Sequence, residues 1–426
     1  MMSRKADVVI IGGGASGLAA AIELGMEAPE LEVLVIEKMS EPARKIRATG
    51  SGRCNISNTD AEGFSRIMRF FREIGIVTRT LDNGLVYPYS ESAADVAELL
   101  IERAVSLGVE IACGEEVISV SQGGSEGRFS VVSALRDKDG EHHITTSAAH
   151  VILSCGGKAG PSYGTTGDGY RIARELGHSV VTPVPALTGI ECREWDRGRE
   201  PCGIMLGGTR SQGVVSLYRD MTECFDEDSM VFSEAGEIQF TKYGLSGICV
   251  FNMTRCMRYD KSEGESPGGF LVKADLFAGG DIRAFIKDRQ ESRFSEMCTG
   301  DLLRTVLKEP LAEYITAEAA AKAGLEAYEL ADRPLSSLGE AETEALASCV
   351  HALEFRPKII RGWKEAQLTM GGVPADEIDE ATSESKIVPG LYITGELADR
   401  DFRCGGFNLS NAWITGLAAA DDIANK

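Results

Sequence analysis

The sequence predicts an α/β protein built on a Rossmann-type dinucleotide-binding domain. A β-branched apolar run at 7–11 is followed at once by a G-x-G-x-x-G pattern at Gly12–Gly17. Residues 18–26 are rich in Ala and Leu, contain no proline, and predict a helix. A second apolar run at 31–36 ends on Glu37. Strand, glycine turn, helix, strand and acid in this order and spacing form the βαβ unit that binds dinucleotides.

Each part of this unit has a physical role. Gly12 makes the tight turn, Gly14 lets a pyrophosphate approach the backbone, and Gly17 lets the helix pack closely on the strand. The free N–H groups of the helix N-terminus would bind phosphates, and Glu37 would accept hydrogen bonds from a ribose. An isolated glycine pattern would fit an ordinary turn, but here the flanking strands and the acid are both present. The residues assigned to cofactor binding are Gly12, Gly14, Ala15, Ser16, Gly17, Glu37 and Lys38.

Length and charge restrict the possible protein classes. The chain has 426 residues, which predicts two or three domains. It contains 44 Lys and Arg against 65 Asp and Glu, a net charge of −21. Such a charge argues against nucleic acid or an anionic membrane surface as the main partner. No apolar run approaches the ~20 residues of a membrane span. We therefore expect a small-molecule substrate and no membrane insertion.

Cysteine and histidine usage indicates no structural metal or disulfide. The eleven cysteines include no C-x-x-C pair, so free thiols in a reducing compartment are the simplest interpretation. The five histidines form no ligand-spaced set, and we expect no metal site. The first predicted strand begins so early that no signal peptide precedes it, which predicts a cytoplasmic protein.

Residues 43–58 predict a loop that contacts the cofactor. The segment follows the second strand, shows little periodicity and carries four positive side chains. A loop leaving this strand lies on the same sheet edge as the glycine turn. A solvated basic loop is the alternative, but its glycines and Asn55 favour a cofactor clamp. The residues assigned to this clamp are Arg44, Lys45, Gly52, Arg53, Cys54 and Asn55.

The middle of the chain interrupts the nucleotide-binding pattern. Residues 111–120 and 127–134 alternate as strands, and 151–154 form a buried strand that opens into Cys155–Gly157. We divide the chain into a first part of the dinucleotide domain (1–189), a small β-barrel-like subdomain (190–275), a helical subdomain (276–355) and a returning C-terminal part (356–426).

Several segments, spread over almost the whole chain, carry a family resemblance. Residues 50–55 are close to a G-N-G-R-C-N segment, and further matching segments lie at 85–90, 155–157, 165–170, 176–178, 236–241, 244–247, 371–373, 384–386, 388–392, 395–396 and 405–409. With them the sequence resembles the bacterial FAD-dependent family of aminoacetone-oxidase-type enzymes, the YhiN-like flavoproteins. This family includes 3-dehydro-bile-acid Δ4,6-reductases.

The resemblance implies FAD as cofactor and adds residues to its site. Val117 would lie behind the adenine, although plain core packing is the alternative. The N-terminus of a helix at 412–423, started by 407–411, would stabilise negative charge at the flavin N1–O2 edge; a capped surface helix is the alternative. The added residues are Val117, Cys155, Gly156, Gly157, Gly395, Glu396, Gly406, Asn408 and Leu409. Candidates for substrate contact at the flavin face are Tyr163, Arg403 and Cys404.

By the same resemblance the inserted segments would form a lid over the substrate; an unrelated module is the alternative. The chain has no second strand–GxGxxG–helix unit, so NAD(P)H would bind transiently over the flavin. The expected reaction passes a hydride from NAD(P)H through FAD to an activated C=C of a small, apolar, steroid-like substrate. The alternatives are an amine or aminoketone oxidase that uses oxygen, and a non-catalytic flavin-binding redox sensor.

Overall fold

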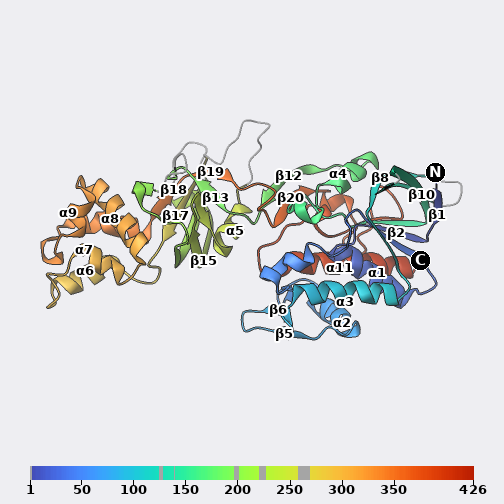
Figure 1. The fold of residues 1–426 in the computed structure, drawn as a ribbon. Coiled ribbons are helices and arrows are strands. Elements are labelled where there is room, and N and C mark those ends of the chain that lie inside the picture. The colour runs from blue at the N-terminus through green and yellow to red at the C-terminus, as the bar shows by residue number, and fades with distance from the viewer. Residues whose placement is uncertain (1, 124–127, 139, 196–200, 220–226, 258–268) are drawn as a thin grey trace. The chain divides into compact units, whose positions relative to one another are not determined.

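The computed structural model describes residues 2–123, 128–138, 140–195, 201–219, 227–257 and 269–426. It divides into two compact units. The discontinuous unit comprises Met1–Pro185 and Ala366–Lys426, and the inserted unit comprises Ala186–Glu365 (Figure 1). The N-terminal and C-terminal parts of the chain therefore build one unit together.

The discontinuous unit is centred on a five-stranded parallel sheet in the order β21-β11-β2-β3-β7. Its strands are β2 Val8–Ile11, β3 Val33–Glu37, β7 Glu110–Cys113, β11 His150–Leu153 and β21 Leu391–Ile393. Successive side chains of a strand point to opposite faces. Val8 and Ile10 join one hydrophobic cluster, whereas Val9 and Ile11 join another. Both faces are covered, which explains why these strands are continuous apolar runs.

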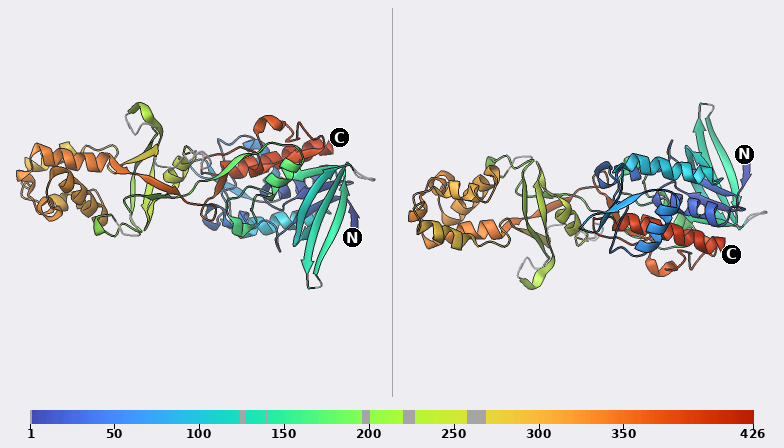
Figure 2. Two further views of the ribbon diagram at one scale, coloured as in Figure 1. Left: turned by 90° about the horizontal axis from the view of Figure 1, so that it is seen from above. Right: turned by 90° about the horizontal axis from the view of Figure 1, so that it is seen from below.

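Helices cover one face of this sheet and a second sheet helps to cover the other. Helices α1 Ala15–Glu27, α2 Phe64–Glu73, α3 Ala93–Ser106 and α11 Phe407–Ala424 contribute to the first cluster. Strands β1 Met2–Lys5, β8 Glu115–Gln122, β9 Phe129–Asp137 and β10 Gly140–Ala148 form a sheet in the order β1-β10-β9-β8. Figure 2 shows β9 and β10 as a long hairpin. Strands β8 and β9, with α4 Asp168–Glu175, contribute to the second cluster.

Two smaller sheets complete this unit. Strands β4 Ser57–Asn58, β6 Leu85–Pro88 and β5 Thr78–Thr80 form one, and β12 Val181–Ala186 and β20 Leu368–Gly372 form the other. The short 3-10 helices are η1 Ile46–Gly52, η2 Pro161–Tyr163, η9 Ala375–Glu377 and η10 Gly395–Leu397. These short elements carry most of the loop residues that the sequence assigns to the cofactor.

The inserted unit has one seven-stranded sheet, in the order β18-β17-β14-β15-β16-β13-β19. Its strands are β13 Ile190–Cys192, β14 Arg210–Arg219, β15 Met230–Phe240, β16 Gly244–Ser246, β17 Phe270–Asp275, β18 Leu353–Phe355 and β19 Pro357–Ile360. The two edge strands, β18 and β19, are separated only by Arg356. One continuous segment thus forms both edges of the sheet, and the β-barrel-like subdomain stays a prediction.

Helices of the inserted unit share the hydrophobic core of this sheet. They are α5 Ile248–Thr254, α6 Ile282–Gln290, α7 Thr299–Arg304, α8 Glu309–Ala323, α9 Ala327–Ala331 and α10 Glu340–His351, with η4 Pro201–Gly203, η5 Glu227–Ser229 and η8 Leu335–Ser337. A single cluster contains Val272 and Phe355 of the strands together with Tyr314 and Leu346 of the helices. The segments that we separated at 275/276 therefore pack as one body.

The α/β class with a Rossmann-type domain is confirmed, and one predicted strand is wrong. The alternating run at 111–120 is two strands, β7 and β8, in two different sheets. Gly114 separates them because it has a φ of +74°, a conformation that glycine adopts without strain. The second alternating run begins in the structure at Phe129 and ends at Asp137; residue 127 lies outside the described residues.

Candidate cofactor site

Among the three glycines of the G-x-G-x-x-G pattern between β2 and α1, Gly12 and Gly17 are packed, whereas Gly14 faces open space. Gly12 has a φ of +106°, and a Cβ there would lie 2.6 Å from the Ser154 oxygen. A Cβ on Gly17 would lie 2.0 Å from the Gly12 oxygen. Around Gly14, no atom of the described chain comes within 4 Å of the corresponding position. The turn therefore leaves room in front of α1, where a pyrophosphate fits.

The N-terminus of α1 offers hydrogen-bond donors to that space. Its first helical hydrogen bond runs from the Leu18 N–H to the Gly14 oxygen, at 2.9 Å. The N–H groups of Ala15, Ser16 and Gly17 precede this bond, and Gly14 supplies no capping side chain. Free N–H groups and the helix dipole together favour an anion.

The acid at the end of β3 is held firmly in place. Glu37 accepts hydrogen bonds from the Gly13 N–H at 2.9 Å and from the Met39 N–H at 2.8 Å, one on each carboxylate oxygen. Each oxygen retains a second lone pair. The carboxylate therefore lies beside the glycine turn with capacity to accept ribose hydroxyls.

Lys38 points toward a different segment. Its ammonium forms an ion pair with Asp168 and donates a hydrogen bond to Thr166 Oγ1 at 2.5 Å. Partial burial acts to raise the pKa of Asp168, but the hydrogen bonds from Lys38 and Thr166 outweigh it and hold this pKa below its usual value. A direct contact of Lys38 with the cofactor stays a prediction; in this structure Lys38 fixes the start of α4.

The basic loop is compact, and its side chains point in several directions. Arg44 donates a hydrogen bond of 3.4 Å to the Ser162 oxygen, and the Arg53 guanidinium lies 5.0 Å from the centre of the Tyr87 ring. Cys54 is fully buried, and burial raises the pKa of its thiol to about 11. A Cβ on Gly50 would lie 2.9 Å from the Asn55 nitrogen, so the loop closes tightly there. Gly52, with a φ of +86°, and Asn55 take part in this compact turn.

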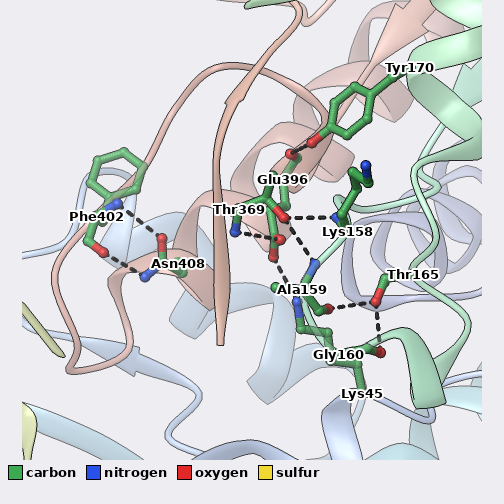
Figure 3. Close-up of polar contacts among 10 residues, drawn as sticks. All are labelled: Lys45, Lys158, Ala159, Gly160, Thr165, Tyr170, Thr369, Glu396, Phe402 and Asn408. Atoms are coloured by element: carbon green, nitrogen blue, oxygen red, sulfur yellow. Dashed lines mark hydrogen bonds and ion pairs between the residues drawn. The ribbon is translucent and has the colours of Figure 1, made fainter. Parts of the chain in front are cut away.

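Lys45 joins a network that connects four distant segments (Figure 3). Its ammonium lies 2.8 Å from Glu396 Oε2, and Glu396 Oε1 accepts a hydrogen bond of 3.0 Å from the Thr369 N–H. Thr369 Oγ1 in turn accepts from the N–H groups of Lys158 at 2.8 Å and Ala159 at 3.0 Å. Opposite ends of the chain thereby close around the glycine turn.

This network explains the glycines after β11. A Cβ on Gly157 would lie 2.3 Å from Thr369 Oγ1 and 2.6 Å from Glu396 Oε1. Gly156 has a φ of +66°. The half-buried Cys155 donates to the Ile11 oxygen at 3.5 Å, and burial raises the pKa of this thiol to about 12. Cys155 thus acts as a packing residue here.

The loop before α11 is fastened by a side-chain amide. Asn408 Nδ2 donates to the Phe402 oxygen at 2.8 Å, and Asn408 Oδ1 accepts from the Phe402 N–H at 3.0 Å (Figure 3). Gly406 has a φ of +90°, and a Cβ there would lie 2.5 Å from the Ser57 oxygen. The first helical bond of α11 joins the Ser410 N–H to the Gly406 oxygen at 2.9 Å. The N–H groups of Asn408 and Leu409 precede it and remain available to an anionic edge.

The remaining predicted residues lie in four places. Val117 is buried among residues of the second hydrophobic cluster, which agrees with core packing. Gly395 has a φ of +65°, and its N–H donates to Thr415 Oγ1 at 2.9 Å. Tyr163 is 38% exposed at the end of η2. Arg403 lies 4.8 Å from the centre of the Phe407 ring and, with Cys404, belongs to the loop that Asn408 fastens. In the described residues no ring contact or hydrogen bond joins Tyr163 to Arg403.

Sequence reasoning missed several residues that hold the site together. Thr369, Thr166 and Asp168 have no role in the predicted set. Asp168 lies in the segment 165–170, which is one of the segments that carry the family resemblance, but the sequence assigned no role to Asp168 itself. Thr369 carries no local signal, because its partners are 27 and more than 200 residues away.

The fold and the glycine turn define a dinucleotide-binding protein of the Rossmann type. The model of the HI0933-like protein Rossmann domain matches residues 6–66 and 63–422, and the chain belongs to the HI0933-like flavoprotein family. The resemblance seen in the sequence is thereby confirmed.

Two relatives that match this chain over almost its whole length are named for different reactions. A 3-dehydro-bile acid delta(4,6)-reductase from Clostridium scindens is 30% identical over 443 residues, covering 98% of both chains. A ribosomal RNA dihydrouridine synthase from Escherichia coli is 25% identical over 436 residues, again covering 98% of both chains. Among solved structures, a variant of FrdA from the Escherichia coli quinol fumarate reductase has a TM-score of 0.49 and 15% identity, covering all of this chain and 71% of FrdA. Within the described residues, no helix combines the length and apolar character that crossing a membrane requires.

Proposed function

We propose that the protein saturates an activated C=C bond of a small, largely apolar substrate, with FAD as hydride carrier and NAD(P)H as electron donor. The observation that carries this proposal is the similarity to the bile-acid reductase over 98% of both chains. The name of the second relative supports the same chemistry, because a dihydrouridine is a uridine whose ring C=C has been reduced. In both cases the double bond is conjugated to a carbonyl group.

The substrate class follows from charge as much as from similarity. The chain carries a net charge of −21, which opposes binding to an RNA backbone. A small neutral or amphipathic enone is therefore favoured over ribosomal RNA. The absence of a nucleic-acid partner stays a prediction, since one group of relatives is named for a reaction on RNA.

In such a reaction, different residues of the site would have different roles. The bound FAD supplies hydride-transfer chemistry. The N–H groups at the start of α1 and the Glu37 carboxylate would hold the pyrophosphate and the ribose. The N–H groups of Asn408 and Leu409 would stabilise negative charge at the far end of the cofactor. Tyr163 and Arg403 are proposed to orient the substrate, which takes up a hydride at one carbon and a proton at the neighbouring one.

Product stoichiometry tests the proposal. Holoenzyme, NADPH or NADH, and a 3-oxo steroid with conjugated double bonds are incubated without oxygen. We expect one nicotinamide to be oxidised for each C=C that gains two hydrogens, as measured by absorbance and by mass spectrometry. Oxygen-dependent turnover of an aminoketone, with no reaction of the enone, would instead identify an amine oxidase. The same assay is repeated with ribosomal RNA, whose uridine is the alternative hydride acceptor, and the two rates of nicotinamide oxidation are compared.

A further inference from the structure

A cavity of about 530 Å³ lies on the outer face of α11, apart from the residues assigned to FAD. Helix α11 and the following Asn425 line it along one side, and its other walls come from residues 61–66, 380–383 and 400–402. All of these segments belong to the discontinuous unit. Its volume lies within the range of small-molecule sites in proteins.

Two buried polar side chains line this cavity without a partner. Asn411 is 7% exposed and Ser383 is 3% exposed. In the part of the chain that the structure describes, no hydrogen bond reaches the amide of Asn411 or the hydroxyl of Ser383. Neither belongs to the fully buried polar atoms that lack a partner, so both are open to the cavity and can form hydrogen bonds there. A ligand in the cavity would supply the missing hydrogen bonds.

The backbone at Ser383 is also strained. Its φ is +59°, a conformation that residues other than glycine, Asn and Asp rarely adopt. Neighbouring bonds enforce this conformation, because the Ser383 N–H donates to the Asp379 oxygen at 2.8 Å and the Ile393 N–H donates to the Ser383 oxygen at 2.9 Å. Strain that the surrounding structure maintains is typical of binding sites.

One guanidinium in the wall is only loosely paired. Arg400 lies 3.6 Å from Glu380, whose side chain is 79% exposed, and such ion pairs contribute little. By contrast, Arg66 is committed to Glu23 and Asp421. Asp422 accepts from the Tyr392 hydroxyl and pairs with Lys426. Among the charged side chains in contact with the cavity, Arg400 is therefore the one most available to an anion, and the exposed Glu62 stands at the rim.

The rest of the lining is apolar. Phe402, Phe407, Ile414 and Ala418 contribute to it. We propose that this cavity is a binding site for a small amphipathic anion. Its carboxylate or phosphate pairs with Arg400, its polar atoms bond to Asn411 and Ser383, and its apolar part packs on Ile414 and Ala418. The proposal goes beyond the proposed reaction and does not require turnover.

The cavity shares a wall with the candidate cofactor site. Thr415 Oγ1 donates to the Asn411 oxygen at 2.6 Å and accepts from the Gly395 N–H at 2.9 Å. Gly395 belongs to the residues assigned to FAD. Occupation of the cavity is therefore expected to perturb the visible spectrum of the bound flavin.

Titration of the holoenzyme tests the site. Cholate represents a steroid carboxylate, NADP+ a nucleotide, and inorganic phosphate a bare anion; binding is followed by calorimetry and by the flavin spectrum. We expect saturable one-site binding of cholate or NADP+, and the tighter of the two identifies the source of the anion. Phosphate binding as tightly as either, or no binding of cholate and NADP+, overturns the proposal.

Two variants and one control assign the binding to this cavity. Asn411→Asp is isosteric and adds a negative charge, so we expect the affinity for the anion to fall about tenfold or more. Ala418→Phe fills the cavity and should have the same effect by a different route. Arg171→Gln, which removes a surface ion pair on α4, should leave the affinity unchanged. Unchanged affinity in both cavity variants, with FAD content retained, contradicts the assignment.

Discussion

Two helix N-termini in this protein are expected to face the same cofactor, and they are constructed differently. The start of α1 is made by one short stretch, in which Gly12 and Gly17 contact each other and Ser154, the residue that follows β11. The start of α11 is assembled from distant segments, since Gly406 packs on Ser57 and Asn408 fastens Phe402. Neither helix has a capping side chain. Local sequence therefore specifies the first of these proposed anion sites, whereas tertiary contacts specify the second.

The largest effect should come from a methyl group in the first site. Gly17→Ala places a Cβ 2.0 Å from the Gly12 oxygen, and overpacking of this kind costs on the order of 3 kcal/mol. We expect a lower free energy of unfolding and loss of bound FAD, as measured by denaturant unfolding and by flavin absorbance.

Gly14→Ala is the matched control in the same turn. Its Cβ meets no atom of the described chain within 4 Å, and the φ of −84° suits alanine. The free energy of unfolding should stay the same while the methyl group enters the phosphate space and lowers FAD affinity. Equal destabilisation by both substitutions would show that the turn is not packed as described.

The second site should respond through its loop rather than through the fold. Asn408→Ala removes both hydrogen bonds to Phe402, each worth about 1 kcal/mol. We expect faster amide hydrogen exchange in 398–406 and slower flavin reduction, with FAD content nearly unchanged. If exchange in this loop is unaltered, Asn408 does not fasten it.

Low pH should break the ion pair between Lys38 and Asp168 and lower the stability of the protein. Partial burial opposes the shift, but Lys38 and Thr166 hold the pKa of Asp168 below its usual value in the folded protein. A group with a lowered pKa contributes stability that is present above its unfolded pKa and is lost as the pH falls through the folded value. The thermal midpoint of the wild type should therefore fall more steeply below about pH 4 than that of Asp168→Asn. Parallel curves for the two proteins would exclude a role for this ion pair.

The smallest effect should be at Cys54. Its thiol has a pKa of about 11 and is fully buried, so the reactive thiolate is scarce at neutral pH. Iodoacetamide should leave Cys54 unmodified in native holoenzyme at pH 8 and label it after unfolding, as mapped by peptide mass spectrometry. Labelling of the native protein would place this thiol in contact with solvent.

The same comparison explains which features could be predicted from the sequence. The roles of Gly12, Gly17 and Glu37 follow from spacing alone, since their contacts lie within 30 residues or at Ser154, directly after the adjoining strand β11. The ion pair of Lys45 and Glu396 joins positions 351 residues apart, and only family resemblance brought both into one set. Thr369 could not be found, because a threonine in a buried strand has no distinctive pattern.

Alternation of apolar residues also has a limit that this chain illustrates. The run at 111–120 alternates throughout, yet Gly114 turns the chain from the five-stranded parallel sheet into the four-stranded mixed sheet. The pattern reports which face is buried, but it does not report which sheet buries it.

The most direct test of the account is an anaerobic spectrum of the purified protein. We predict bound flavin that is bleached by NADPH or NADH and regains its colour on addition of a conjugated enone. A flavin that is not reduced by NADPH or NADH but is reduced by an aminoketone would contradict the reductase assignment. Failure of the protein to bind FAD at all would contradict the candidate cofactor site.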